Sequence, residues 1–305
     1  SWRDWLLRTV AGDPNQLQIM YGVDGTRRLP EMQLPWLTGY EGSAPVRLGN
    51  GAADQFQLDV PGELMDAMGV ARMAGMEPDP HAWSLVQTVV DHIAKVWDQP
   101  DEGIWEVRGG AQNFVYSKVM AWVAADRAAR RAELVGDNAE RGRYRSLADT
   151  IHADVMAKGF DSDRNTFVQA YGTKALDASL LQIPIVGFLP GDDSRVAGTI
   201  DAIKQELVQD GFVARYLTDD AADGLAGTEG SFLICSFWLI QAIALQGNLD
   251  EARGLLEQML SLRNDVGLLS EEYDTVNKRM LGNFPQAFSH IGLVNAALAC
   301  EACTS

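Results

Sequence analysis

Four short turns recur along this chain, and each is followed by an apolar helical segment. Each turn holds a small or turn-forming residue, an apolar residue and then a tyrosine or a glutamate. The four stretches are 102–106 (EGIWE), 165–171 (NTFVQAY), 210–216 (DGFVARY) and 266–273 (VGLLSEEY). They follow one another at intervals of roughly 45 to 65 residues, which suits one pair of helices with its loops, so the pattern predicts an array of helical hairpins.

Apolar residues at three- and four-residue spacing mark about ten helices. They are expected near residues 2–11, 54–75, 81–97, 117–134, 138–158, 176–187, 194–208, 231–246, 249–262 and 286–301. No run alternates with period two over a useful length, so we predict an all-α fold. Asp177 and Asp193 stand where N-terminal caps are expected, and Gly247 stands just past a helix end. Pro61 is harmless in a first helical turn but would kink the helix if it lay deeper.

The expected helices alternate in character. Segments 176–187 and 231–246 are apolar on nearly every side, whereas 138–158 and 249–262 carry charge on one face. A helix that is apolar on every side must be enclosed by others, so we predict an inner ring of helices inside an outer ring, an (α/α) toroid. Residues 19–50 hold too many prolines and glycines for a helix, and we expect this segment to cross the mouth of the ring.

The net charge of −17 argues against nucleic acid and anionic membranes as partners. The nearest basic group, Arg127, Arg130 and Arg131, is interpreted as the solvated face of a helix. The N-terminal residues do not resemble a secretory signal, and the most apolar window is shorter than a membrane span.

The three cysteines form no disulfide framework, which favours a reducing compartment and a cytoplasmic location. No histidine or cysteine spacing indicates a metal site, and no glycine pattern indicates a nucleotide, so no cofactor is expected.

Two of the recurring turns carry glutamates that could hydrolyse a glycosidic bond. That reaction needs one carboxyl group to protonate the leaving oxygen and a second to act from the other side. Partial desolvation raises the pKa of a carboxyl group and keeps it an acid near neutral pH. Glu106 lies between Trp105 and Val107 and fits the acid, while Glu271 has polar neighbours and fits the base. A solvated surface charge is the alternative interpretation of each glutamate.

Residues 103–109 (GIWEVRG) and 269–274 (LSEEYD) resemble the two catalytic-glutamate segments of glycoside hydrolase family 15. That family contains glucoamylases, glucodextranases and bacterial trehalases on an (α/α)6 barrel. Further similar blocks are 18–25, 45–50, 176–181, 214–216 and 282–290, so the resemblance covers nearly the whole chain. It implies an (α/α)6 toroid of the six-hairpin glycosidase kind.

The resemblance also implies roles for individual residues. Glu106 would be the general acid and Glu271 the general base of an inverting hydrolysis, with their carboxyl carbons roughly 6.5–9.5 Å apart. Trp105 would stack on a glucose ring, and Arg215 would donate paired hydrogen bonds to sugar hydroxyls. Arg47 and Tyr40 resemble further sugar contacts. His290 lies in a shared block, where a sugar contact and a structural hydrogen bond remain equal alternatives.

The chain departs from the family at its start. Members begin the barrel with a helix that carries a Trp-x-Arg-Asp motif, and residues 2–5 resemble that motif only superficially. We therefore expect residues 1–305 to form a single (α/α) barrel catalytic domain that lacks the first helix.

The first hypothesis for function is an inverting, exo-acting α-glucosidase of glucoamylase type, which releases glucose from the non-reducing ends of α-glucans. An α,α-trehalase on the same fold is the alternative within this class. A non-catalytic glucan-binding or regulatory module is an alternative from another class. The departure at the start of the chain motivates the module, and the presence of both glutamates opposes it.

Overall fold

The computed structural model describes residue 5 and residues 18–76, 80–107, 109–217 and 230–302. The helix expected at 2–11 lies almost wholly outside these residues. The chain divides into two compact units. Unit 1 comprises residues 1–32 and 49–159, and unit 2 comprises residues 33–48 and 160–305.

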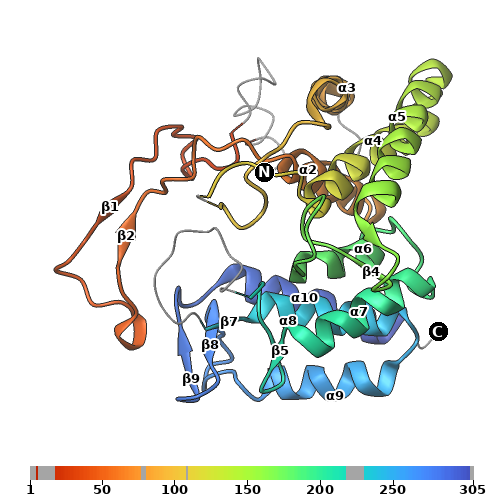
Figure 1. Ribbon diagram of the computed structural model, residues 1–305. Helices are drawn as coiled ribbons and strands as arrows, with labels where there is room; N and C mark the ends of the chain where they lie inside the picture. Colours follow the sequence, from red (N-terminus) through yellow and green to blue (C-terminus); the bar gives the residue numbers. More distant parts are fainter. Residues whose placement is uncertain (1–4, 6–17, 77–79, 108, 218–229, 303–305) are drawn as a thin grey trace. The chain divides into compact units, whose positions relative to one another are not determined.

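The described part of unit 1 is helical. Its helices are α2 (Asp59–Met73), α3 (Pro80–Val96), α4 (Val115–Val135) and α5 (Asn138–Lys158). Figure 1 shows α4 and α5 side by side as an antiparallel hairpin, as predicted for neighbouring helices with a short connection. Pro61 is the third residue of α2, so it lies in the first turn, where its missing N–H has no helical partner to lose.

Unit 2 combines helices with very short strands. The helical elements are η2 (Tyr40–Gly42), η3 (Ala178–Leu181), α6 (Gln182–Ile185), α7 (Ser194–Glu206), α8 (Leu233–Leu245), α9 (Leu249–Leu260) and α10 (Ala287–Ala302). The strands are β2 (Arg47–Leu48), β3 (Phe160–Asp161), β4 (Thr166–Phe167), β5 (Val208–Gln209), β6 (Phe212–Val213), β7 (Ser231–Phe232), β8 (Glu272–Asp274) and β9 (Arg279–Leu281). A further strand, β1 (Met32–Gln33), spans the boundary between the units and pairs with β2.

Three of the four recurring turns form or border antiparallel strand pairs, namely β3–β4, β5–β6 and β7–β8–β9. These strands are only two or three residues long, which is too short for a period-two pattern to be visible in the sequence. Asn165 and Asp210 turn the first two hairpins with left-handed backbone φ angles of 52° and 51°. Asparagine and aspartate tolerate this conformation better than most residues, which explains the polar residue that opens each turn.

The helix expected at 176–187 is wrong as one continuous α-helix. The structure instead has the 3-10 turn η3 followed by the four-residue α6. Pro184 cannot donate an N–H and clashes with the preceding turn, so it is confined to the start of α6. Asp177 caps η3 by accepting a hydrogen bond from the Ser179 N–H at 2.8 Å, so the predicted cap is confirmed.

The predicted burial of individual helices is largely confirmed. In α8, eleven of thirteen residues are buried, as expected for a helix enclosed by others. Figure 1 shows α8 beside α10, and both α9 and α10 contact it. By contrast α5 buries only one stripe, which consists of Tyr144, Ala148, Ile151 and Val155. That spacing is the period of a helix with one face in the core.

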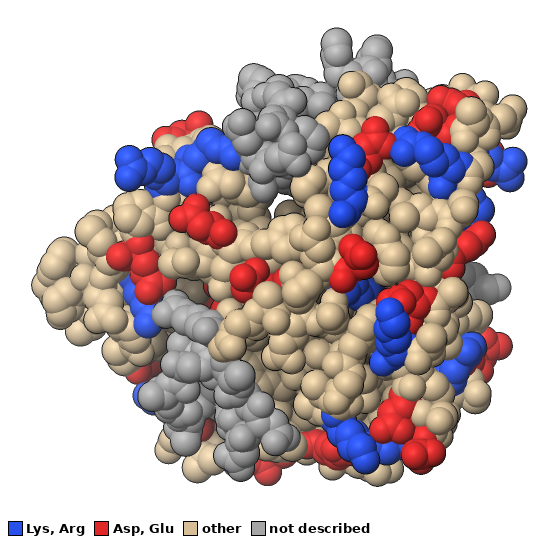
Figure 2. Space-filling view, turned by 45° about the horizontal axis from the view of Figure 1, so that its top comes forward, with Lys and Arg blue, Asp and Glu red and all other residues tan. Residues whose placement is uncertain are grey.

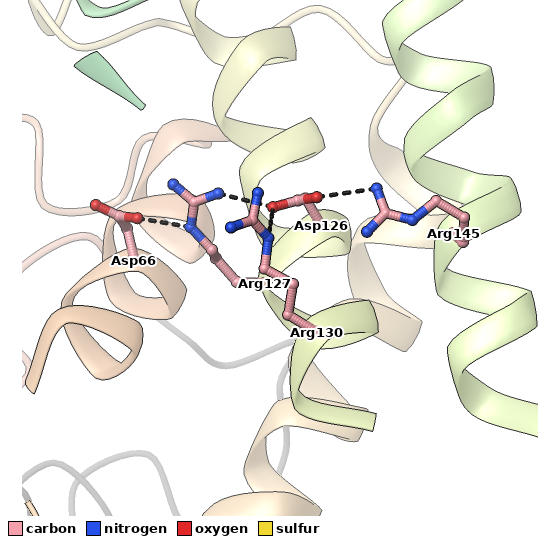
Figure 3. A network of polar contacts seen from close by, with 5 residues as sticks. All are labelled: Asp66, Asp126, Arg127, Arg130 and Arg145. Carbon is pink, nitrogen blue, oxygen red and sulfur yellow. Dashed lines mark hydrogen bonds and ion pairs between the residues drawn. The ribbon is translucent and has the colours of Figure 1, made fainter. Parts of the chain in front are cut away.

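A network of ion pairs around Asp126 joins three helices of unit 1 (Figure 3). Asp126 on α4 is 2% exposed and accepts from Arg127 at 2.7 Å, from Arg130 at 2.7 Å and from Arg145 of α5 at 2.9 Å. Arg127 also pairs with Asp66 of α2 at 2.8 Å. Arg127 is therefore a largely buried structural residue, which corrects its interpretation as part of a solvated face.

We expect Asp126→Asn to destabilise unit 1 by about 2–4 kcal/mol, because removing one partner of a buried ion pair leaves the other charges uncompensated. Chemical denaturation of the purified protein measures this loss. Arg141→Gln is the control, since Arg141 forms an exposed pair with Glu133 that is worth about 1 kcal/mol or less. An equal loss in both variants would contradict the central role of Asp126.

Acidic and basic side chains are interspersed on the face drawn in Figure 2. Exposed ion pairs of the described residues include Arg143 with Asp91 at 2.7 Å. Among the described helices, none is both long enough and apolar enough to cross a membrane.

Candidate active site

The predicted site residues fall into two groups. Trp105 and Glu106 lie in unit 1, and Tyr40, Arg47, Arg215 and Glu271 lie in unit 2. Each group is built from the contacts within its own unit.

Glu106 lies in a tight turn with an unusual backbone. Its φ angle is 55°, in the left-handed region that residues with a side chain rarely adopt. The turn is closed by two hydrogen bonds, from the Glu106 N–H to the Gly103 carbonyl at 3.2 Å and from the Val107 N–H to the Glu102 carbonyl at 3.2 Å. Such strain costs about 1–3 kcal/mol and is typical of functional sites, where surrounding contacts enforce it.

The Glu106 carboxylate is oriented by a carboxamide. Asn50 Nδ2 donates to Oε1 and to Oε2, at 3.3 Å each. Gln55 Nε2 supports the same turn by donating to the Val107 carbonyl at 3.2 Å. A neutral amide can hold a carboxyl group in either protonation state, because it offers a donor and an acceptor.

The neighbouring glutamate has a different, structural duty. Glu102 Oε2 accepts from the Phe56 N–H at 2.9 Å, and the Glu102 N–H donates to the Phe56 carbonyl at 3.0 Å. Glu102 therefore binds the backbone just before α2, while the Glu106 carboxylate accepts from the side-chain amide of Asn50.

Glu271 precedes β8 and is also held by amides. Its Oε2 accepts from the Asn283 N–H at 3.0 Å and from Asn283 Nδ2 at 2.9 Å, and its Oε1 accepts from Gln286 Nε2 at 3.3 Å. Gly282 has a φ angle of 74°, and a Cβ atom there would lie 2.7 Å from Glu271 Oε2. Only glycine therefore leaves this carboxylate undisturbed.

Side chains of α10 form hydrogen bonds with the backbone just before Glu271. Ser289 Oγ donates to the Ser270 carbonyl at 2.6 Å. The His290 ring accepts from the Leu269 N–H through Nε2 at 3.3 Å, and its Nδ1 lies 2.7 Å from the Gln286 carbonyl. Both ring nitrogens thus have backbone partners, and of the two alternatives for His290 the structure supports the structural hydrogen bond.

Glu272 repeats the pattern of Glu102. It accepts from the Gly230 N–H at 3.0 Å and pairs with Phe232 and Leu281 in the three-stranded sheet. In both glutamate-bearing turns, one glutamate accepts from a backbone N–H of another segment and the other accepts from carboxamide side chains, with the Asn283 N–H as an additional donor to Glu271.

Two of the predicted sugar contacts lie on aromatic side chains. The Arg215 guanidinium, on a residue only 8% exposed, lies 4.5 Å from the centre of the Phe232 ring and 5.1 Å from that of Tyr216. Tyr40 stacks on Phe284 with ring centres 4.0 Å apart and planes 11° apart. Phe284 directly follows Asn283, whose side chain donates to the Glu271 carboxylate. Arg47 is exposed in β2.

Sequence reasoning missed the residues that orient the glutamates. Asn50, Asn283 and Gln286 lie inside blocks of family resemblance, so the blocks contained a signal for them. Gln55 lies outside those blocks. No group of three or more histidines, cysteines, aspartates or glutamates in the described part of the chain could hold a metal ion.

Comparison with known proteins decides the family. Residues 1–298 match the sequence model of glycosyl hydrolases family 15. The chain belongs to this family. Its relatives include a trehalase of Mycolicibacterium smegmatis, 45% identical over 94% of this chain and 43% of the relative, and a trehalase of Thermoplasma volcanium, 42% identical over 93% and 45%. The chain thus spans less than half the length of these curated relatives.

Solved structures show the fold. A glycosidase in complex with glucose has a TM-score of 0.68 at 22% identity and covers 86% of this chain and 73% of its own. A bacterial glucoamylase complexed with acarbose has a TM-score of 0.67 at 15% identity, with coverages of 86% and 44%. These likenesses confirm the predicted fold class, an all-α fold of the (α/α)6 toroid type.

Proposed function

We propose that this family 15 protein hydrolyses α,α-trehalose with inversion, with Glu106 as the general acid and Glu271 as the general base. The observation that carries the proposal is that carboxamide side chains donate to one glutamate in each turn. Asn50 donates to Glu106, and Asn283 and Gln286 donate to Glu271. Glu271 also accepts from the Asn283 backbone N–H, and backbone N–H groups donate to Glu102 and Glu272. The relatives named trehalase, at 42–45% identity, favour trehalose over the α-glucans that the sequence analysis placed first.

The reaction divides the work between the two carboxyl groups. Glu106 gives its proton to the glycosidic oxygen as the bond from that oxygen to the anomeric carbon breaks. A water molecule attacks the same carbon from the opposite face and gives a proton to Glu271. Trp105 stacks on a glucose ring, and Arg215 donates to sugar hydroxyls with a guanidinium held by its aromatic neighbours. Tyr40 and Arg47 are proposed as further sugar contacts.

The configuration of the first products tests the mechanism. Inversion converts one glucose of trehalose to the β anomer and releases the other as the α anomer, so we expect the two anomers in about equal amounts before they equilibrate. Proton NMR of the complete protein with trehalose measures this ratio. A retaining enzyme would release only the α anomer, which would contradict the assignment of Glu271 as a base.

The same assay separates the competing functions. Maltose and a longer α-glucan serve as second substrates, and faster turnover of these than of trehalose would favour the glucoamylase hypothesis. Glu106→Gln is the control for background hydrolysis. Binding of sugar with no turnover in either protein would favour the non-catalytic module.

A further inference from the structure

Asp101 begins the turn that carries Glu106, and the proposed reaction gives it no role. Asp101 is 0% exposed. Its backbone forms a two-way bridge with Gln112, with N–H to carbonyl distances of 2.9 Å and 2.8 Å. Asp101 is thus the fixed first residue of the strained turn 101–107.

One carboxylate oxygen of Asp101 accepts three hydrogen bonds, which come from three parts of unit 1. Its Oδ2 accepts from Ser117 Oγ on α4 at 2.7 Å, from the Leu58 N–H just before α2 at 3.1 Å, and from the Gly103 N–H at 3.1 Å. A single atom therefore ties the turn to the starts of two core helices. Hydrogen bonds to an ionised acceptor are about twice as strong as those between neutral groups, which makes this a stiff support.

The other carboxyl oxygen of Asp101 and one carboxyl oxygen of Asp59 are also buried. Neither Asp101 Oδ1 nor Asp59 Oδ1 has a hydrogen-bond partner among the described residues, and both atoms are buried. Burial, then the charges of Asp101 and Glu63, raise the pKa of Asp59 to about 8. Burial raises the pKa of Asp101 to about 6, against the hydrogen bond from Ser117 and the charge of Lys118. The pKa of Asp59 is raised more than that of Asp101, so Asp101 is the first of the two to ionise as the pH rises.

Burying a charged carboxylate at this position costs free energy, because the charge is removed from water. An asparagine carbonyl could accept the same three donors without burying a charge. The turn, however, must keep Glu106 at a φ angle of 55°, and such a conformation persists only where its surroundings enforce it. Weaker hydrogen bonds to residue 101 would let the backbone of the turn relax, and this would displace the Glu106 carboxyl group.

We propose that Asp101 is the positioning residue for Glu106, and that its buried carboxylate holds the strained turn so that Glu106 can protonate the leaving oxygen. The inference rests on the proposed function, because it takes Glu106 as the general acid. Asp101 acts through the turn and does not touch the substrate.

The test compares two substrates that differ in their need for an acid. Trehalose needs a proton on its leaving oxygen, whereas α-glucosyl fluoride releases fluoride without one. In Asp101→Asn of the complete protein, we expect kcat for trehalose to fall about 10- to 100-fold with KM changed less than about threefold. We expect kcat for the fluoride to fall less than about threefold, because the acid is not needed there.

Two further variants keep the test decisive. Asp126→Asn changes a buried aspartate of the same unit that lies outside the turn, so it should lower stability and leave the ratio of the two rates unchanged. Ser117→Ala removes one of the three donors to Asp101 and should shift the ratio in the same direction by about three- to tenfold, which provides a readout if Asp101→Asn does not fold. An equal fall with both substrates, or no fall, in both turn variants would overturn the proposal.

Glu106→Gln, assayed in parallel, separates this proposal from the function on which it rests. Loss on trehalose with the fluoride rate retained supports Glu106 as the acid. If Glu106→Gln shows that selectivity and the Asp101 and Ser117 variants do not, only the positioning role is rejected. If Glu106→Gln itself affects both substrates equally, the proposed acid is wrong.

Discussion

Replacement of Glu271 with glutamine is expected to lower kcat for trehalose by about 10²- to 10⁴-fold, because an amide cannot take a proton from the attacking water. The substrate is bound by other groups, so KM should change little. The fold should persist, since a glutamine oxygen can accept from both Asn283 donors and the Gln286 amide can turn to meet the new NH₂ group. Steady-state kinetics with thermal unfolding of the same sample measure both effects.

The adjacent glutamate is the matched control. Glu272→Gln changes the same residue type one position along, where the carboxylate accepts from the Gly230 N–H and lies in β8. It should reduce kcat by less than about threefold, because a glutamine carbonyl can still accept that bond. If Glu271→Gln kept normal turnover, or if the two variants lost activity equally, Glu271 would not be the base.

Asp59 is expected to make unit 1 less stable as the pH rises. Its folded pKa is about 8, above the ordinary value of 3.8, because of burial and then the charges of Asp101 and Glu63. The folded state therefore keeps a proton that the unfolded chain has already lost. The stabilisation is fully present below about pH 4 and is lost as the pH rises through about 8. This one group should lower the free energy of unfolding by about 3–6 kcal/mol across that window.

Asp59→Asn isolates the effect, since an asparagine resembles the neutral acid and does not titrate. The difference between the free energy of unfolding of this variant and that of the unmodified protein should increase as the pH is raised from about 5 to about 8.5. Denaturant titration at each pH measures this difference. Glu140→Gln is the control in the same unit, because the hydrogen bond from Arg143 lowers the pKa of Glu140 and the group is ionised throughout that range. A pH-independent difference for Asp59→Asn would show that the buried carboxyl group does not titrate in this window.

Most helices could be predicted because their signal is local. The stripe on α5 and the fully apolar α8 are both readable from spacing within one segment, since a helix repeats every 3.6 residues. The segment 176–187 shows the limit of that reasoning. Its apolar run looks continuous, but Pro184 lacks the backbone donor that a continuous α-helix would need there, and the structure has a 3-10 turn followed by a short helix.

The support of the candidate site could not be predicted, because it depends on residues far apart in the chain. Asn50 donates a hydrogen bond to Glu106, which is 56 residues away in the sequence, and the Leu58 N–H donates to Asp101, which is 43 residues away. No spacing rule connects such pairs. The family resemblance marked blocks that contain Asn50 and Asn283, but it assigned these residues no partner. The separation of roughly 6.5–9.5 Å between the carboxyl carbons of Glu106 and Glu271, which an inverting mechanism implies, stays a prediction.

The sequence by itself determined the helical periods, the recurring turns and the family to which those turns belong, since each of these is written in short contiguous stretches. Only the tertiary structure decided which hydrogen-bond partners the glutamates of each turn have. Local neighbours and the family resemblance singled out Glu106 and Glu271, but they did not show which groups donate hydrogen bonds to the two glutamates of each turn. The hydrogen-bond donors to each carboxylate come from segments distant in the sequence, and folding alone determines which groups lie opposite one another.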